Sequence, residues 1–152
     1  MEGNNKNIMK FRVAASDTEF QGTISNPRYF EWFSKGRIEY YRECGALSRN
    51  DKGVPLIAGG KLAVVLTSTN CKFYSPSGFD DLLELTTSVS HLGEHSIVFK
   101  HELFNLSRDN ALVARAEAIH VFLEPDTLQK AQVPKDLAGI IRDSFEDDKP
   151  NK

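Results

Sequence analysis

The chain has 152 residues, the length of one domain with one hydrophobic core. Apolar residues make up 40% and charged residues 26%, which excludes a disordered, collagen-like or low-complexity chain. The 19 Lys and Arg residues against 21 Asp and Glu residues give a net charge of −2, which argues against a protein that binds nucleic acid or an anionic membrane surface.

No stretch approaches the roughly 18 consecutive apolar residues of a membrane span, and the N-terminus lacks the apolar core of a signal peptide. We therefore expect a cytoplasmic protein without membrane insertion. Cys44 and Cys71 form no CxxC pair, so both are predicted to be reduced thiols. Composition predicts flexible tails at residues 1–9 and 143–152, and one domain over residues 10–142.

The first half of the domain predicts a short strand and one long helix. The strand is expected at Lys10–Ala15, followed by a loop rich in turn residues. The helix is expected over residues 27–44, with Asn26 as its N-cap and Pro27 at its first position. Its aromatic residues are too many for a solvent-facing helix, so we expect it to be largely buried.

The second half predicts strands that form an antiparallel meander. These strands are expected at Leu62–Tyr74, Asp81–His91, His95–Asn105 and Ala111–Glu124. A short helix is predicted from Pro134 to Phe145. The result is an α+β fold, in which a five-stranded antiparallel sheet is wrapped around one long central helix.

The last strand predicts two different sheet faces. Small side chains on one face, Ala114, Ala116 and Ala118, would allow the bulky helix to pack closely. The other face is left open. It is expected to carry Arg115 and Glu117 among Val113, Ile119 and Val121. Such a mixed surface suits a subunit contact, so we expect oligomerisation.

Three blocks of sequence carry a family resemblance. The first runs from Asp17 to Tyr29 and continues to Trp32-Phe33 and Arg37. The second comprises Phe73–Pro76 and Phe79–Leu83, and the third is Val133–Leu137. In order and spacing these blocks resemble the hotdog-fold acyl-CoA thioesterases of the 4-hydroxybenzoyl-CoA thioesterase type.

The resemblance implies a hotdog fold, dimers whose strands join into one sheet, frequent pairing into tetramers, and active sites between subunits. The family motif contains two acids, and the second is the catalytic carboxylate. Here Asp17 matches the first acid and Glu19 the second. The family polarises the thioester carbonyl with the N–H group at the helix start, which matches Asn26. We expect no cofactor and no metal ion.

The chemistry of a thioester calls for the same two groups. Attack on its carbonyl carbon needs a carboxylate on one side and hydrogen-bond donors on the oxygen, which Glu19 and the helix start at Asn26 can supply. Because Pro27 has no N–H group, the N–H of Asn26 is the donor most available to a ligand. Glu19 would act as a nucleophile or as a general base on water. Because Glu is longer than Asp, and attack through water tolerates more displacement, the general base is favoured.

Other residues are expected to support this site. Asp17 would hold the loop by hydrogen bonds from its side chain to the backbone, while Gly22, Thr23, Pro27 and Tyr29 shape the loop and the helix start.

The phosphates of CoA need cations. Some relatives use a basic cluster at a turn that is Leu92–Ser96 here, where that cluster is missing. The phosphates are therefore expected at Lys61, Lys72 or Arg108, unless the acyl carrier is not CoA.

The histidines predict no catalytic or metal site. His91 and His95 flank a glycine turn and are expected to be solvated, while His101 and His120 lie in strands and are expected to be satisfied structural residues. A hotdog hydratase or dehydratase would pair its acid with a histidine. No histidine is near Glu19 in the sequence, which argues against this alternative. A catalytically weak protein that binds acyl thioesters or an acyl carrier protein stays open. So do the acyl group and the choice between dimer and tetramer.

Overall fold

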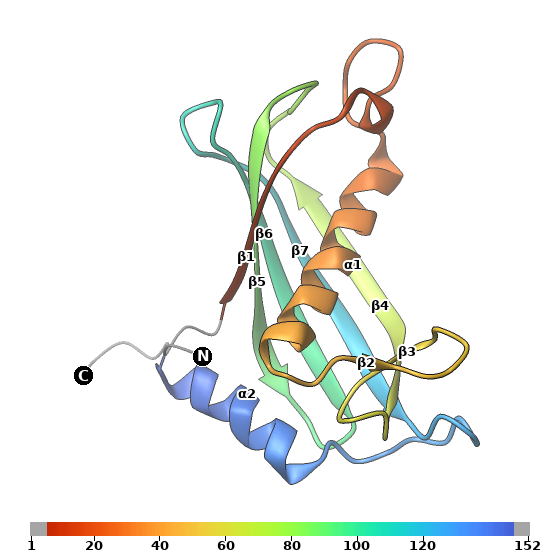
Figure 1. Ribbon diagram of the computed structural model, residues 1–152. Coiled ribbons are helices and arrows are strands. Elements are labelled where there is room, and N and C mark those ends of the chain that lie inside the picture. Colours follow the sequence, from red (N-terminus) through yellow and green to blue (C-terminus); the bar gives the residue numbers. More distant parts are fainter. Residues whose placement is uncertain (1–5, 148–152) are drawn as a thin grey trace.

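The structure is a computed structural model that describes residues 6–147. A five-stranded antiparallel sheet curves around helix α1 (Asn26–Glu43), as Figure 1 shows. The sheet contains β1 (Lys6–Arg12), β5 (Leu82–Leu92), β6 (Ser96–Asn105), β7 (Ala111–Leu123) and β4 (Ala63–Phe73), in this order. The short 3-10 helix η1 (Ala15–Asp17) precedes α1. A small hairpin of β2 (Ser48–Arg49) and β3 (Pro55–Leu56) follows it, and the chain ends in helix α2 (Lys135–Asp147).

β1 begins earlier than the strand predicted at Lys10–Ala15. Its seven residues all pair with β5. Asn7 is buried there, and its side-chain amide donates a hydrogen bond to the Glu43 carboxylate at the end of α1 (2.8 Å). Residues 6–9, predicted as tail, therefore belong to the sheet, while residues 1–5 lie outside the described part of the chain.

α1 confirms the predicted long helix to within one residue at each end. Its N-cap is Ser25 and not Asn26, because Ser25 is extended and its carbonyl accepts the first helical bond, from Arg28 N–H (3.0 Å). Pro27 therefore takes the second helical position, where no N–H bond is needed. The predicted burial of the aromatic residues is confirmed for Tyr29, Trp32, Phe33, Tyr40 and Tyr41.

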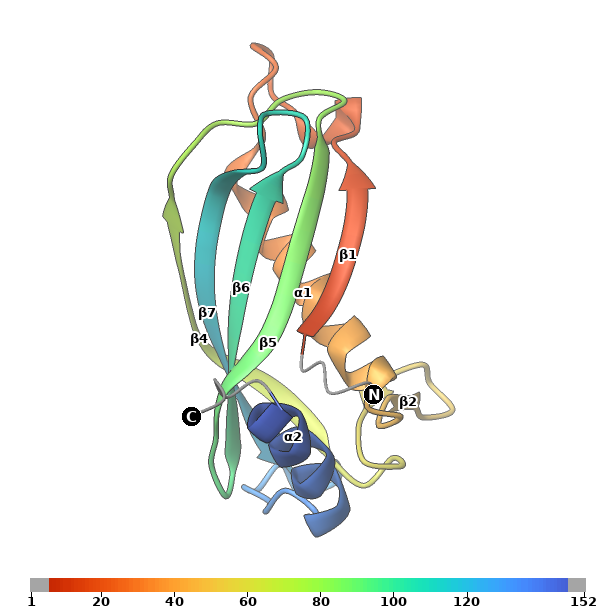
Figure 2. The same ribbon diagram turned by 90° about the vertical axis from the view of Figure 1, so that its left-hand side faces the viewer.

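β5, β6 and β7 form a meander as predicted, but β4 does not lie next to β5 (Figure 2). It pairs with β7 at the far edge, and β1 occupies the free side of β5. The prediction of a meander of all four strands was wrong at its first connection, because the connection from Tyr74 to Asp81 is not a tight turn. Tyr74 N–H stays bonded to Val113 O of β7 (2.8 Å), and the connection then crosses the end of the sheet to β5.

The two faces of β7 follow the prediction except at Val113. The small side chains Ala114, Ala116 and Ala118 are buried on the helix side. Val113 is also buried, because the register of β6 and β7 shifts beside it and this bulge turns two successive residues inward. Arg115 and Glu117 are exposed on the open face, as expected.

Two clusters of buried side chains fill the space between the sheet and the helices. The first lies under the beginning of α1 and includes Trp32 and Leu85. The second lies under its end and joins Tyr41 and Phe99 to Ile141 of α2. α2 thereby closes the lower end of the sheet (Figure 1).

α2 is longer than predicted. It begins at Lys135, one residue later than predicted, and continues to Asp147, two residues beyond the predicted end at Phe145. The part of the predicted tail at residues 143–147 is therefore helical. Residues 148–152 lie outside the described range. No helix within residues 6–147 combines the length and the apolar character needed to cross a membrane.

Candidate active site at the start of the long helix

A cavity of about 370 Å³ opens at the first turn of α1, at the upper end of the molecule in Figure 1. Its walls come from the loop before α1, from α1 itself and from the chain that follows β4. Phe73, the last residue of β4, and Tyr74 directly after it supply aromatic surface. Three predicted site residues, Thr23, Asn26 and Tyr29, meet at this one cavity.

Asn26 lines the cavity and carries an unbonded backbone donor. Its backbone N–H opens α1 and makes no bond to an acceptor within residues 6–147. Pro27 has no N–H, and that of Arg28 is already bonded to Ser25. The positive end of the helix dipole lies at the same point, so this end of α1 can stabilise negative charge that develops on a carbonyl oxygen.

Glu19 lies on a short hairpin that leads into the cavity wall. Thr18 and Ile24 bridge its base, and Glu19 N–H donates to Thr23 O (2.7 Å). Gly22 closes the turn by donating to Glu19 O (2.8 Å), at a φ of +85° that favours glycine. The Glu19 side chain is exposed and does not line the cavity. Within a single chain, the predicted acid therefore stands outside the cavity that holds the predicted donor.

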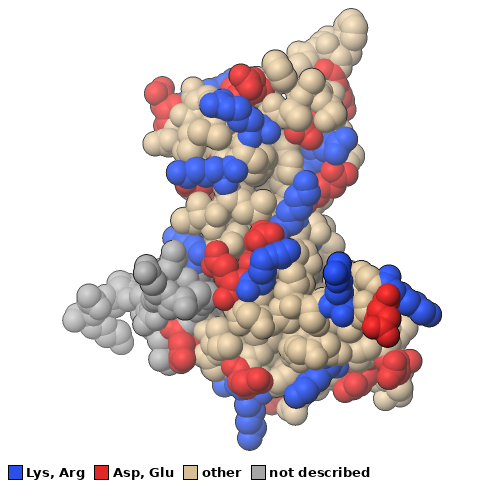
Figure 3. All heavy atoms as spheres, viewed as in Figure 1, with Lys and Arg blue, Asp and Glu red and all other residues tan. Residues whose placement is uncertain are grey.

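The hairpin projects beyond the sheet at the upper end of the molecule (Figures 1 and 3). Phe20 at its tip is wholly exposed. On the face drawn in Figure 3, basic and acidic side chains are interspersed and form no broad field of one sign. This face therefore offers little long-range electrostatic attraction to a charged molecule.

Asp17 holds the base of this loop. Its Oδ2 accepts the Ala14 N–H (2.8 Å), the kind of bond to the backbone that the sequence predicts for it. Its Oδ1 lies 3.7 Å from Arg28 Nε, and Arg28 also donates to Ser16 O (3.3 Å). Asp17 therefore ties the loop to the first turn of α1.

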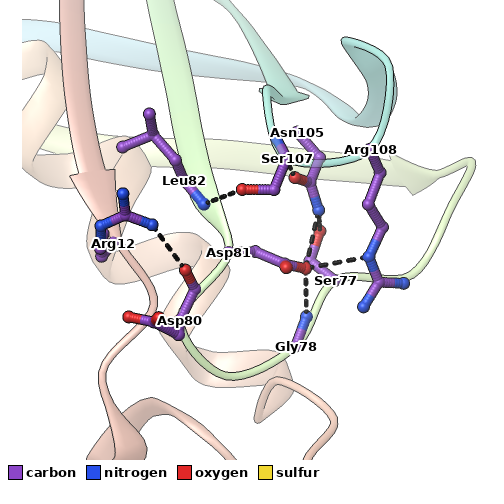
Figure 4. Close-up of polar contacts among 9 residues, drawn as sticks. All are labelled: Arg12, Ser77, Gly78, Asp80, Asp81, Leu82, Asn105, Ser107 and Arg108. Atoms are coloured by element: carbon purple, nitrogen blue, oxygen red, sulfur yellow. Dashed lines mark hydrogen bonds and ion pairs between the residues drawn. The ribbon is translucent and has the colours of Figure 1, made fainter.

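The cavity wall after β4 is fastened by Asp81 (Figure 4). Asp81 Oδ2 accepts hydrogen bonds from Gly78 N–H (2.9 Å) and Asn105 Nδ2 (2.9 Å) and lies 3.1 Å from Arg108 Nε. Asn105 Nδ2 also donates to Ser77 Oγ (3.1 Å), and Ser77 lines the cavity. Burial raises the pKa of Asp81, but these hydrogen bonds and the Arg108 charge outweigh it and hold the pKa below its ordinary value.

The three predicted phosphate-binding cations lie in three different places. Arg108 is bound to Asp81 behind the cavity wall. Lys72 is exposed on the open face of the sheet, in a hollow of about 270 Å³ that shares Tyr74 with the cavity. Lys61 precedes the beginning of β4 and so lies at the end of the sheet opposite to the cavity.

No histidine lines the cavity. His101 and His120 are buried and hydrogen-bonded through both ring nitrogens, which confirms their expected structural role. His91 and His95 are exposed at the turn between β5 and β6. Among the described residues, no group of three or more His, Cys, Asp or Glu side chains is placed to hold a metal ion.

Sequence reasoning missed Asn105 and Ser77, which shape the cavity wall. Asn105 is wholly buried although it is polar, and it ends a strand whose inward positions are otherwise mostly apolar. A polar residue at an inward position of a strand was the available signal, because a buried amide needs hydrogen-bond partners. Ser77 gives no comparable signal, since serine is common in connections.

Comparison with known proteins supports the resemblance. A family model described as the thioesterase-like superfamily matches residues 13–141. The 4-hydroxybenzoyl-CoA thioesterase of Pseudomonas sp. strain CBS-3 is 26% identical over 136 residues, which cover 87% of this chain and 94% of that protein. The acyl-CoA thioester hydrolase YbgC of Escherichia coli O157:H7 is 24% identical over 131 residues, 86% of this chain and 92% of that protein.

The fold agrees with solved structures. That of the Pseudomonas sp. 4-hydroxybenzoyl-CoA thioesterase superposes with a TM-score of 0.77 at 24% identity and covers 90% of this chain and 99% of that one. This similarity confirms the predicted hotdog fold, and the family match confirms the predicted class of enzyme, a thioester hydrolase. The chain therefore belongs to the thioesterase-like superfamily.

Proposed function

We propose that this protein hydrolyses acyl-CoA thioesters in the cavity at the start of α1. The observation that carries the proposal is the free Asn26 N–H group at a cavity with aromatic walls. The thioester carbonyl oxygen would accept this N–H, while the acyl group packs against Tyr29 and Phe73. The names of the relatives, which include acyl-CoA and aroyl-CoA thioesterases, support this substrate class.

Glu19 is the proposed general base. Its carboxylate takes a proton from a water molecule as the water oxygen bonds to the carbonyl carbon, and the tetrahedral oxyanion is stabilised by the Asn26 N–H. Collapse breaks the C–S bond, and the CoA thiolate receives the proton from Glu19. The exposed position of Glu19 supports this route over direct attack, because a water molecule extends the reach of the carboxylate.

A variant on the same hairpin tests this role. We expect Glu19→Gln to lower kcat by about 100-fold or more, since general-base catalysis contributes about 10²–10⁴-fold. Gln21→Ala, at an exposed position of the same turn, should stay within about twofold of the parent. Release of free thiol from short, long and aromatic acyl-CoA thioesters is the measurement. Near-normal turnover by Glu19→Gln would remove Glu19 from the mechanism, and no release from any thioester by the parent chain would favour a binding protein.

Two copies are proposed to pair through the edge strand β4. One side of β4 bonds to β7, and the other side has no partner strand within the described chain. An exposed strand edge of 11 residues favours pairing with another strand, and Val65 and Leu66 add exposed apolar surface there. A twofold axis makes this pairing antiparallel, so the end of each β4 lies beside the beginning of the other.

This pairing explains how Lys61 can belong to the site. In one chain Lys61 lies far from the cavity, but antiparallel pairing brings Lys61 of the partner subunit toward Phe73 and Tyr74. Lys72 stands on the open face beside Tyr74, with Lys100 and Arg115 in the same hollow, and both of these are paired with Glu102. Lys72 has no such ion pair among residues 6–147. We therefore propose Lys72 and the partner's Lys61 as the cations that bind CoA phosphates, and Arg108 as a structural residue.

Substrates with and without phosphates test this assignment. Lys72→Gln and Lys61→Gln should each raise KM for an acyl-CoA by about threefold to tenfold and leave kcat unchanged, because the phosphates lie far from the reacting carbon. The same variants should not change KM for the acyl thioester of pantetheine, which lacks the nucleotide. Lys52→Gln, on an exposed loop, is the control. Equal effects on both substrates would contradict the assignment.

A further inference from the structure

Arg37 lies in the middle of α1 and points into the core between the helix and the sheet. It is 5% exposed. Its Nε donates a hydrogen bond to His120 Nε2 (3.1 Å) on β7, and its Nη1 lies 3.1 Å from His101 Nε2 on β6. No ion pair between Arg37 and a carboxylate occurs in the described chain. A single guanidinium thus joins α1 to two neighbouring strands of the sheet.

Arg37 determines which nitrogen atoms of His101 and His120 donate and which accept hydrogen bonds. A guanidinium only donates, so Nε2 of His101 and of His120 must both accept. Each imidazole then carries its proton on Nδ1 and donates it outward, His101 to Thr87 Oγ1 (3.0 Å) and His120 to Tyr41 Oη (3.0 Å). Burial, and next the Arg37 charge, lower the pKa of both histidines to about 3, so both rings are neutral. The five side chains therefore share one hydrogen-bonding arrangement.

The neighbouring residue allows α1 to lie close to the sheet at this point. A Cβ atom on Gly36 would overlap with Thr87 Oγ1 of β5 and touch Leu85. The helix therefore rests on the sheet at Gly36, and Arg37 bonds it to β6 and β7 beside that contact. Because the guanidinium group is rigid and planar, its two hydrogen bonds restrict both the sliding of α1 along its axis and its rotation around that axis.

We propose that Arg37 is a positioning residue for thioester hydrolysis: by fastening the middle of α1 to the sheet, it sets where the Asn26 N–H meets the thioester carbonyl. This inference rests on the proposed function. Asn26 precedes Arg37 by 11 residues on the same helix, about 16 Å along its axis. A tilt of about 4° around Arg37 then moves Asn26 by about 1 Å. A displacement of about 1 Å can cost about 100-fold in rate.

Two substitutions at the cluster and one elsewhere test the inference. Arg37→Lys keeps the charge but replaces the planar guanidinium group with a single ammonium group, which cannot bond both imidazoles in the same geometry. Thr87→Val keeps the shape and removes the acceptor of His101, and it serves if Arg37→Lys does not fold. Ile141→Ala removes buried apolar volume from α2 without changing any of the five hydrogen-bonded side chains, and is the control for lost stability alone.

Under conditions in which all variants are folded, we expect Arg37→Lys to lower kcat by about tenfold to 100-fold, with KM within about twofold. Thr87→Val should lower kcat by about threefold, and Ile141→Ala should leave kcat within about twofold despite its lower Tm. In ¹⁵N-labelled protein, the amide resonance of Asn26 should shift in Arg37→Lys and stay in place in Ile141→Ala.

Unchanged kcat in Arg37→Lys, or an unmoved Asn26 resonance, would overturn the inference. So would an equal loss of kcat in Ile141→Ala. These outcomes differ from failure of the proposed function, in which the unaltered protein releases no thiol from any acyl-CoA. The resonance of Asn26 then still shows whether Arg37 positions the start of α1.

Discussion

The carboxylate of Asp81 accepts a hydrogen bond from the buried amide of Asn105, 2.9 Å away, and this pair joins the cavity wall to the end of β6. Asp81→Ala removes the acceptor and leaves Asn105 Nδ2 and the Gly78 N–H short of a partner. We expect the free energy of unfolding to fall by about 2–4 kcal/mol, since hydrogen bonds to charged groups are worth about 1.5–3 kcal/mol each. Urea denaturation measures the loss.

Asp80 is the control for this prediction. It is exposed, and its backbone carbonyl, not its carboxylate, accepts the hydrogen bond from Arg12. Its φ of 66° is one that Asn tolerates well, so Asp80→Asn should change stability by less than about 0.5 kcal/mol. Equal losses in Asp80→Asn and Asp81→Ala would contradict the assigned role.

The two helical glycines of α1 and α2 should respond to alanine in opposite directions. Gly36→Ala places a Cβ against Thr87 Oγ1, and overpacking of this kind costs about 1–3 kcal/mol. Gly139 has open space around the same position, so Gly139→Ala should stabilise the protein by about 0.5–1 kcal/mol through helix propensity. Thermal unfolding compares them, and a rise in Tm for Gly36→Ala would contradict the close contact.

Stability should fall as the pH drops below about 6.5. Burial and the Arg37 charge lower the pKa of His101 and His120 to about 3 in the folded protein, against an ordinary value of 6.5. Between these values the unfolded chain binds protons that the folded one does not. The contribution of the two neutral histidines to the free energy of unfolding is therefore fully present above pH 6.5. It is lost toward pH 3, by about 1.4 kcal/mol per pH unit for each histidine.

Urea denaturation at pH 7.5, 6 and 5 measures this slope. His101→Gln should lower the slope by the contribution of one histidine, about 1.4 kcal/mol per pH unit. His91→Gln, at an exposed position, should leave the slope unchanged. A slope that does not respond to His101→Gln would contradict the neutral buried imidazole. Asp81 contributes only at lower pH, because the pKa of its carboxyl lies below the ordinary value of 3.8.

Pairing through β4 predicts a dimer that a charge on the strand should weaken. Val65→Lys places a cation on the exposed edge strand, and we expect Kd of the dimer to rise by about 100-fold. Val54→Lys, a similarly exposed valine on a loop, is the control. Sedimentation velocity gives the masses, and an unaltered chain that stays monomeric at high concentration would refute the pairing.

The long helix and the extents of the later strands could be predicted from the sequence. Aromatic spacing and Pro27 indicated α1, and alternation along β7 indicated its buried alanines. The position of β4 was not predictable in this way, because alternation shows which face of a strand is buried but not which strand lies beside it. That choice depends on Tyr74 remaining bonded to β7 after β4 ends.

The candidate site was predicted in part for a similar reason. Asn26, Thr23 and Tyr29 are close in sequence and meet at the cavity. Charge alone indicated Lys61 and Arg108, and only the folded chain shows that they lie at opposite ends of the sheet. Likewise the Arg37 cluster joins residues up to 83 positions apart, which no local pattern reveals.

The hairpin that carries Glu19 differs from α1 in local stability. It projects from the molecule, its tip is solvent-exposed, and few backbone hydrogen bonds close it, whereas α1 is packed into the core. Its amide protons should therefore exchange with solvent at opening free energies near zero, while those in the middle of α1 exchange only on global unfolding. We expect the carboxylate of Glu19 to change position on the nanosecond-to-microsecond timescale of surface loops, while the helix packed beside it keeps its place.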